Sequence, residues 1–358
     1  MTLFRFDDAP SVKAGRRLMV RAPLMAAVLI GLACLGACPA FADCKMVQVA
    51  ELALDPHWYG AVADGQINGQ PIKAMIDTGS SLSMVSRSEA AKLDLAFRPI
   101  GATLYGIGGQ HQAYGTTVKS LQIGQLFANN IGLVGSDTLT DPKIAMILGN
   151  DILSQFDVEF DLPDHVMRLF KPEGCSPVQL VYWNKPYSLA PLLGTNRDSP
   201  SVRTSVSLNG QRIAAELDSG DGASVVDITV ANRVGVVIDT SIAAGAVHGL
   251  GQAPRPVSIG QFKSFAFGDE QIGNVRIQLI NLVGDMQLTD QDTDTRIARS
   301  VSGDTEPMML IGDDFLRTHR VLIANREHVI VFSYLGGSVF ATPAEKKPAP
   351  DASPKRLF

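Results

Sequence analysis

A twenty-residue segment occurs twice in this chain. Residues Ile67–Ser86 and Leu208–Asp227 align without a gap at an offset of 141, with 9 identical residues in 20 positions. The two copies of an acidic turn, Asp77-Thr78-Gly79 and Asp218-Ser219-Gly220, fall in register. A duplicated carboxylate in a duplicated turn predicts two half-sites that face each other across a pseudo-twofold axis. That arrangement brings two carboxylates close enough to share one proton.

The same order of elements surrounds both acidic turns. An Asn-Gly pair, at Asn68 and again at Asn209, precedes each turn and is typical of a two-residue β-hairpin. A Gly-rich turn between strands follows each acidic turn. Each copy then closes on an apolar pair and glycine, I-L-G-N-D-I-L from Ile147 and L-I-G-D-D-F-L from Leu310. The chain is therefore expected to contain two β-rich units of similar build.

Length and composition agree with two globular domains. The chain has 358 residues, and about 150 residues per domain gives two domains. A hydrophobic content of 46% with 33 glycines fits a strand-rich globular protein. The net charge of −5 gives no reason to expect a nucleic-acid partner, because nucleic acids bind basic surfaces.

The N-terminal segment has the pattern of an export signal. Three arginines between residues 16 and 21 precede an apolar run, Leu24–Ala37, and Ala40-Phe41-Ala42 offers a cleavage site before Asp43. The run is shorter than the roughly 20 residues of a membrane span, so an uncleaved anchor is the less favoured alternative. The sequence before Cys38 resembles a lipoprotein box, which makes acylation of Cys38 a second alternative. We expect an exported protein, periplasmic or secreted, or else lipid-anchored to the cell envelope.

Two cysteines remain after the predicted cleavage site, Cys44 and Cys175. An even pair in an exported chain favours a disulfide, which would tie the start of the mature chain to the end of the first repeat. Two unpaired thiols are the alternative. Neither cysteine has a histidine or a second cysteine at metal-ligand spacing, so no metal site is expected.

Composition also suggests where the domains begin and end. A linker rich in proline and polar residues separates the copies, a polar insert lengthens the second, and the C-terminal tail has the composition of a disordered segment. The predicted segments are a signal peptide at 1–42, a first lobe at 43–172, a linker at 173–200, a second lobe at 201–340 with its insert at 285–307, and a tail at 341–358.

The duplicated carboxylates suggest a specific chemistry. Two carboxyl groups a few ångströms apart share one proton, because both ionise together only at high cost. The ionised member can take a proton from a water molecule held between them, while the protonated member polarises a substrate carbonyl. Water then attacks an amide directly, with no cofactor and no covalent intermediate. Asp77 and Asp218 are the candidate pair, and by symmetry either is acid or base.

The neighbouring residues fit this chemistry. Gly79 and Gly220 allow the chain to turn sharply and bring backbone N–H groups towards the carboxylates. Thr78 and Ser219 each offer a hydroxyl group. If each hydroxyl reaches the backbone of the opposite turn, the two turns lock together and the spacing of the carboxylates is fixed.

These motifs resemble the aspartic peptidases, and most closely their retroviral-protease-like branch. In the first copy the matching residues are D-T-G-S from Asp77, G-I-G-G from Gly106 and the closing motif from Ile147. In the second copy they are D-S-G from Asp218 and the closing motif from Leu310. The resemblance extends over about Trp58–Phe340.

The resemblance implies an all-β, bilobal aspartic-protease fold, with two pseudo-twofold-related β-barrel-like lobes and short helices in one chain. Two units that retroviral enzymes bring together as a dimer would be fused here, so the active form is expected to be a monomer. An extended protein or peptide substrate would lie beneath a flap. The implied flap and substrate-binding residues are Tyr105, Gly106, Ile107, Gly108 and Gly109, with Gly249, Leu250 and Gly251 in the second copy.

The second copy departs from the family pattern at one position. Asp221 lies three residues after Asp218, where pepsin-like enzymes have serine or threonine, whereas Ser80 keeps the hydroxyl in the first copy. A third carboxyl group that faced the pair would raise its pKa values. The sequence therefore predicts an aspartic endopeptidase with Asp77 and Asp218 as the catalytic pair. The alternative is a peptide-binding or scaffold module that keeps the fold without turnover.

Overall fold

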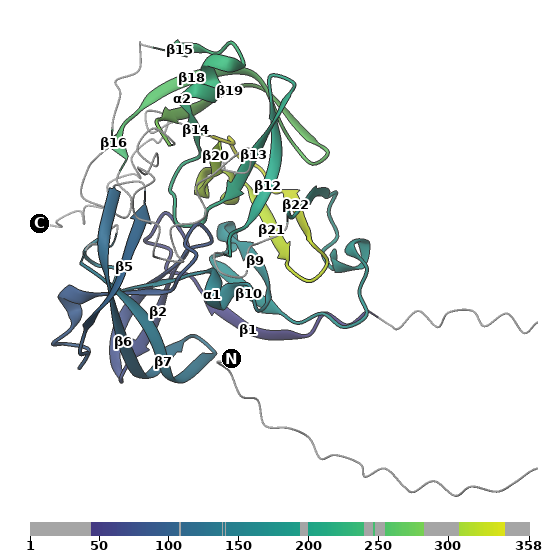
Figure 1. Cartoon of the computed structure of the whole chain (residues 1–358). Helices are drawn as coiled ribbons and strands as arrows, with labels where there is room; N and C mark the ends of the chain where they lie inside the picture. The colour runs from purple at the N-terminus through teal and green to yellow at the C-terminus, as the bar shows by residue number, and fades with distance from the viewer. Residues whose placement is uncertain are drawn as a thin grey trace, which may run out of the picture.

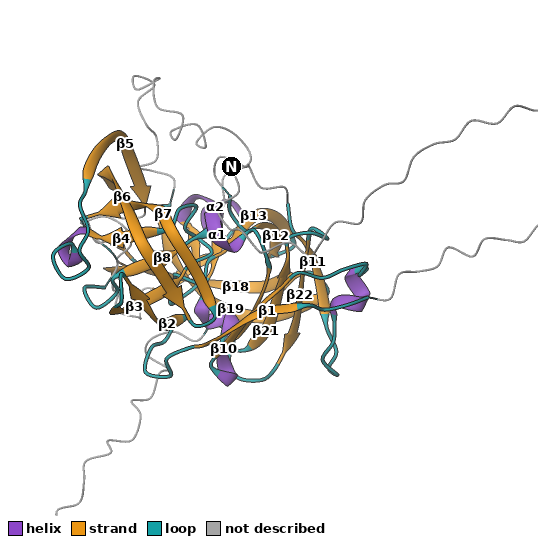
Figure 2. Ribbon diagram, turned by 90° about the horizontal axis from the view of Figure 1, so that it is seen from below, coloured by secondary structure: helices purple, strands orange, loops and turns teal. Residues whose placement is uncertain are grey.

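The computed structural model describes residues 44–106, 109–137, 139, 141–193, 200–239, 246–247, 255–282 and 308–340. The predicted signal peptide, the polar insert and the tail lie outside the described residues. Within the described part, regular structure is nearly all β-strand, and the helices have three to six residues (Figure 2). None of these helices is long and apolar enough to span a membrane.

The first half of the chain forms a closed six-stranded barrel. Its strands pair in the order β2, β3, β8, β4, β7 and β6, and β6 pairs with β2 to close the ring. A further strand, β5, pairs with β6 and lies outside the ring. The bounds are β2 Val62–Ile67, β3 Gln70–Ile76, β4 Met84–Ser86, β5 Arg98–Gly106, β6 Gly109–Ile123, β7 Leu126–Ser136 and β8 Met146–Leu148.

The second half repeats this barrel strand for strand (Figure 1). The ring runs β12, β13, β20, β14, β19 and β18, and a β12–β18 pairing closes it. The edge strand β15 pairs with β18. The bounds are β12 Arg203–Leu208, β13 Gln211–Leu217, β14 Val225–Asp227, β15 Val237–Asp239, β18 Ser258–Phe267, β19 Glu270–Ile280 and β20 Met309–Ile311. Together the two barrels give the bilobal aspartic-protease fold.

Both Asn-Gly pairs form the expected hairpins. Asn68 and Gly69 have φ values of 50° and 78°, and Asn209 and Gly210 have 49° and 80°. Positive φ at both central residues identifies the turn type that matches the twist of paired strands. Each asparagine has a second role. Its side chain donates to the carbonyl of Leu93 in the first barrel and of Val234 in the second, and accepts backbone N–H groups of β6 or β18.

A third sheet joins the two halves. Its six strands run β1, β10, β9, β21, β22 and β11, and each half contributes three. At its centre β9 pairs antiparallel with β21, with Phe160 opposite Val321. The segment expected to be a linker contributes the edge strand β11. The bounds are β1 Gln48–Ala53, β9 Asp157–Asp161, β10 Val166–Phe170, β11 Ser188–Pro191, β21 His319–Ala324 and β22 Val329–Tyr334.

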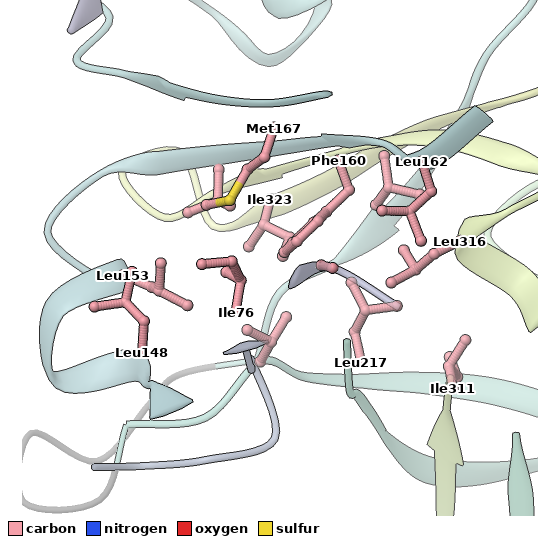
Figure 3. Packing of buried hydrophobic residues seen from close by; sticks show 14 of the residues in the cluster. Ile76, Leu148, Leu153, Phe160, Leu162, Met167, Leu217, Ile311, Leu316 and Ile323 are labelled. Carbon is pink, nitrogen blue, oxygen red and sulfur yellow. The ribbon is translucent and has the colours of Figure 1, made fainter. Parts of the chain in front are cut away.

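One hydrophobic core connects the barrels to this shared sheet. Phe160 and Ile323 on the sheet lie over Ile76 and Leu217, the last residues of β3 and β13 (Figure 3). All four side chains are fully buried. Because Ile76 and Leu217 immediately precede the two acidic turns, this core sets the positions from which both turns begin.

A disulfide closes the outer edge of the shared sheet. Cys44 and Cys175 are bonded, as the even cysteine pair predicts. The bond lies next to an antiparallel bridge between Lys45 and Glu173, which continues the β1–β10 pairing. The remaining short elements are α1 Asn150–Leu153, α2 Ile228–Arg233, α3 Asp313–Leu316, η1 Arg87–Glu89, η2 Leu162–Asp164, η3 Pro177–Leu180, β16 Ala246–Val247 and β17 Arg255–Pro256.

Candidate active site

Each acidic turn begins where an inner barrel strand ends. Asp77 follows β3 and its N–H donates to the Leu148 carbonyl at 3.0 Å. Asp218 follows β13 and its N–H donates to the Ile311 carbonyl at 2.9 Å. These carbonyls end β8 and β20, which run parallel to β3 and β13. The closing motifs therefore hold the two turns at matched places in the two barrels.

The two turns interlock through Thr78 and Ser219. The Thr78 N–H donates to Ser219 Oγ at 3.1 Å, and the Ser219 N–H donates to Thr78 Oγ1 at 3.0 Å. The Thr78 hydroxyl donates to the Leu217 carbonyl at 2.7 Å, and the Ser219 hydroxyl donates to the Ile76 carbonyl at 2.8 Å. Both side chains are buried. This crossed arrangement is the one that the two hydroxyl groups suggested.

The carboxyl groups of Asp77 and Asp218 meet at the centre of this interlock and are hydrogen-bonded to each other. Each carboxyl group lies against the glycine of the opposite turn. A Cβ atom at Gly79 would overlap the Asp218 carboxyl group, and one at Gly220 would lie 2.5 Å from Asp77 Cγ. Glycine is therefore needed at both positions for close approach to the opposite carboxyl group.

Backbone N–H groups reach both carboxyl groups. The Gly79 and Ser80 N–H groups donate to Asp77 Oδ1 at 2.9 and 3.0 Å, and the Gly220 N–H group donates to Asp218 Oδ1 at 2.9 Å. Burial, with the adjacent Asp218, raises the pKa of Asp77 well above its ordinary value of 3.8. Burial also raises the pKa of Asp218, and its hydrogen bonds oppose that rise. The pair therefore holds one proton between its two carboxyl groups.

The third acid of the region, Asp221, also faces inward. Its Oδ2 atom is buried without a hydrogen-bond partner. Burial and the carboxyl groups of Asp218, Asp77 and Asp314 raise its pKa well above 3.8. Ser80, its counterpart, instead donates its hydroxyl to the Leu82 carbonyl at 2.8 Å. The departure seen in the sequence thus places a third carboxyl group, with a raised pKa, beside the pair.

A set of supporting side chains was not predicted from the sequence. Asp151 Oδ1 accepts the Ser83 N–H and hydroxyl at 2.9 and 2.6 Å. Asp314 Oδ1 accepts the Ser224 N–H and hydroxyl at the same two distances. These bonds tie the start of α1 and of α3 to the chain that follows each acidic turn. The sequence did carry a signal for these contacts. The two serines are identical in the aligned repeats, and the two aspartates are identical in the closing motifs.

The predicted flap corresponds in part to described residues. Tyr105 and Gly106 end β5, Gly109 begins β6, and Gly106 pairs with Gly109 in the hairpin. Two residues of the predicted tip, Ile107 and Gly108, lie outside the described residues. The predicted flap residues of the second copy, Gly249, Leu250 and Gly251, also lie outside them.

Among the residues that the structure does describe, no group of three or more His, Cys, Asp and Glu side chains is arranged to hold a metal ion.

A family match lies within the first half of the chain. Residues 63–155 match the family described as "gag-polyprotein putative aspartyl protease". DNA damage-inducible protein 1 of Kluyveromyces lactis is 29% identical over 118 residues, which cover 31% of this chain and 28% of that protein. The chain thus matches less than a third of the length of this relative.

The matched region holds one complete half-site, with Asp77, the β5–β6 hairpin and the first closing motif. It ends before the second acidic turn, which the structure brings against the first. The chain is therefore similar to the retropepsin-like aspartyl proteases over residues 63–155, within a bilobal aspartic-protease fold that its second half completes.

Proposed function

We propose that this protein is an aspartic endopeptidase of the cell envelope, active as a single chain. The observation that carries the proposal is the pair of interlocked turns, which holds Asp77 and Asp218 together with one shared proton. Such a pair supplies an acid and a base at one place, which is the requirement for adding water to an amide.

The two carboxyl groups supply a base and an acid, and by symmetry either residue can fill either role. The ionised carboxylate takes a proton from a water molecule, and the resulting hydroxide attacks the carbonyl carbon of the scissile amide. The protonated carboxyl group gives its proton to the carbonyl oxygen, which produces a neutral gem-diol. When the C–N bond breaks, the newly protonated carboxyl group gives its proton to the leaving amine, and the other carboxylate takes the proton of one gem-diol hydroxyl, so the pair again holds one proton.

The substrate that best fits this fold is a protein or peptide in extended form. The edge strand β5 pairs with β6 and lies outside the ring of the first barrel, where it offers backbone groups for pairing with an added strand. The export pattern at the N-terminus and the disulfide support a location outside the cytoplasm. Soluble and Cys38-anchored forms differ in the mass of their mature N-terminus.

One observation favours a second candidate, a peptide-binding module without turnover. Asp221 places an additional acid beside the pair, with a buried and unpartnered oxygen. If that acid prevented Asp218 from ionising, the site would hold a peptide without activating water.

Incubation of the chain with a diverse peptide mixture from pH 3 to 7 tests both candidates. We expect internal cuts by the wild-type chain that disappear in the Asp77→Asn variant, because the substituted pair cannot share a proton. Folded wild-type chain that binds peptides but leaves them intact at every pH would contradict the endopeptidase and support the binding module.

A further inference from the structure

The duplication sets an amide and a carboxyl group at matched positions beside the catalytic pair. Asn150 begins α1 and Asp313 begins α3. The Asn150 N–H donates to the Ser80 carbonyl at 2.8 Å, and the Asp313 N–H donates to the Asp221 carbonyl at 2.7 Å. With the serine–aspartate bonds described above, these contacts fix both helices in the same register. The two side chains therefore occupy equivalent sites with different chemistry.

In the first half, the side-chain amide of Asn150 holds a backbone carbonyl group in place. Asn150 Nδ2 donates to the Thr78 carbonyl at 2.5 Å in a buried setting. That carbonyl belongs to the same peptide unit as the Gly79 N–H, which donates to Asp77 Oδ1 at 2.9 Å. Because a peptide unit is planar, fixing its carbonyl also fixes its N–H. Asn150 thus orients a hydrogen bond that a catalytic carboxyl group receives.

In the second half, Asp313 lies beside the equivalent peptide unit. A Cβ atom added at Gly60 would overlap Asp313 Oδ2 and lie 3.8 Å from the Ser219 carbonyl oxygen. Asp313 Oδ2 and this carbonyl oxygen therefore both lie next to the position of that added Cβ atom. The peptide unit that carries this carbonyl supplies the Gly220 N–H, which donates to Asp218 Oδ1 at 2.9 Å. An ionised Asp313 has no hydrogen to donate to a carbonyl oxygen, whereas a protonated one does.

The surroundings of Asp313 favour its protonated form. The residue is 1% exposed, and its Oδ1 atom has no hydrogen-bond partner. Burial, followed by the carboxyl groups of Asp218, Asp314 and Asp221, raises the pKa of Asp313 well above its ordinary value of 3.8. A buried carboxyl group that remains neutral can serve as a hydrogen-bond donor.

Two polar side chains complete these surroundings. Arg317, which follows the last residue of α3, opposes the rise in the pKa of Asp313 only in part. Its guanidinium donates to the Tyr59 carbonyl at 2.8 Å and lies 4.7 Å from the centre of the Tyr59 ring. Burial raises the pKa of Tyr59 to about 12, so its hydroxyl is neutral. No described cation forms an ion pair with Asp313.

We propose that Asp313 is a positioning residue that acts in its protonated form, donating to the Ser219 carbonyl and thereby orienting the Gly220 N–H towards Asp218. It does for the second half what the Asn150 amide does for the first. This inference rests on the proposed function for its effect on catalysis, but its effect on the pH dependence of stability is independent of any peptide cleavage.

This role of Asp313 makes the active site sensitive to pH at a group outside the catalytic pair. When Asp313 loses its proton, a carboxylate oxygen faces the Ser219 carbonyl oxygen, and the hydrogen bond to Asp218 loses its support. Activity on the alkaline side then falls with the titration of Asp313. An asparagine at this position keeps its donor at every pH, so it should remove that dependence.

The test compares five full-length chains: wild type, Asp313→Asn, Asp221→Ser, Asp157→Asn and Asn150→Asp. The profile of kcat/KM against pH and the melting temperature against pH are measured for each. Asp221→Ser removes the acid beside the pair that has a buried oxygen without a partner, and Asp157→Asn removes a buried acid in the shared sheet. Asn150→Asp places the same acid in the first half.

We expect Asp313→Asn to shift the alkaline limb of the kcat/KM profile to a pH about one unit higher. At a fixed pH on that limb, kcat/KM would then be about tenfold higher than in wild type. The melting temperature of the variant should also fall less than that of wild type as the pH rises above 3.8, because wild-type Asp313 must lose its proton in a buried site. Asn150→Asp should move the limb downward. Asp157→Asn should change only the melting profile.

Two results would overturn the proposal. The first is an alkaline limb that stays in place in Asp313→Asn, or that moves instead with Asp221→Ser. The second is an Asp313→Asn melting profile that matches wild type. If the wild-type chain cleaves no peptide, the proposed function fails, and the melting profile alone still decides whether Asp313 is the titrating acid.

Discussion

At the scale of single residues, the repeat identified the residues that form the two interlocked acidic turns. Asp77 and Asp218, with the hydroxyl and glycine after each, were predictable because they stand in register in two copies of one segment. The support from Asn150 was not predictable. Its contact with the Thr78 carbonyl joins residues 72 positions apart, and a single sequence does not show which carbonyl a distant amide will meet.

The glycines of the acidic turns give the first prediction. Gly220→Ala should lower kcat/KM at least about a hundredfold, because the new Cβ atom would lie 2.5 Å from Asp77 Cγ and separate the two carboxyl groups. Gly132→Ala is the matched control, since a Cβ atom there meets nothing within 4 Å. Steady-state kinetics on one cleaved peptide measures both. Equal activity in the two variants would show that the carboxyl groups tolerate wider spacing.

The interlock gives the second prediction. Thr78→Val keeps the side-chain shape but removes the donor to the Leu217 carbonyl and the acceptor of the Ser219 N–H. Buried polar groups left without partners cost about 1–3 kcal/mol each, so for the two groups we expect a loss of about 2–6 kcal/mol in the free energy of unfolding. Thr78→Ser should recover most of it. Urea denaturation provides the measurement, and equal stability of the valine and serine variants would refute the role of the hydroxyl.

At the scale of elements, strands and hairpins were predictable but the shared sheet was not. Asn-Gly pairs and apolar runs mark β3 and β13 with their hairpins, because turn chemistry is local. The central pairing of β9 with β21 joins Phe160 to Val321, 161 positions apart. Register over such a distance depends on how the barrels pack, and local periodicity carries no information about it.

Asp157, at the start of β9, gives the third prediction. Burial and the adjacent Glu327 raise its pKa from 3.8 to about 7. Because the folded pKa exceeds the unfolded one, its contribution to stability is complete below pH 3.8 and is lost as the pH rises through about 7. Asp157→Asn should therefore be more stable than wild type near pH 8, by at most about 4 kcal/mol.

Denaturation of wild type and Asp157→Asn at a series of pH values from 4 to 8 measures this effect. The difference between the two chains isolates Asp157 from the other buried acids, which depend on pH in the same direction. A difference that stays constant with pH would contradict a raised pKa at this site.

At the scale of the whole molecule, the shared sheet and the disulfide make the two halves one unit. Three strands from each half form the sheet, and Cys44–Cys175 closes its edge across a sequence separation of 131. A loop of that length predicts a contribution of about 3–5 kcal/mol to the free energy of unfolding. Replacing both cysteines with serine should lower stability by that amount and leave a single unfolding transition. Two separate transitions would show that the barrels unfold independently.

Asp218 lies in the second half of the chain, which the family match does not reach, and is proposed to supply one member of the catalytic pair. The most direct test is the rate at which Asp218→Asn hydrolyses a peptide that the wild-type chain cleaves. Asp269→Asn, an exposed aspartate in the turn between β18 and β19, serves as the control. We predict a loss of about a thousandfold or more for Asp218→Asn and no loss for the control. Hydrolysis by Asp218→Asn at the wild-type rate would contradict the account.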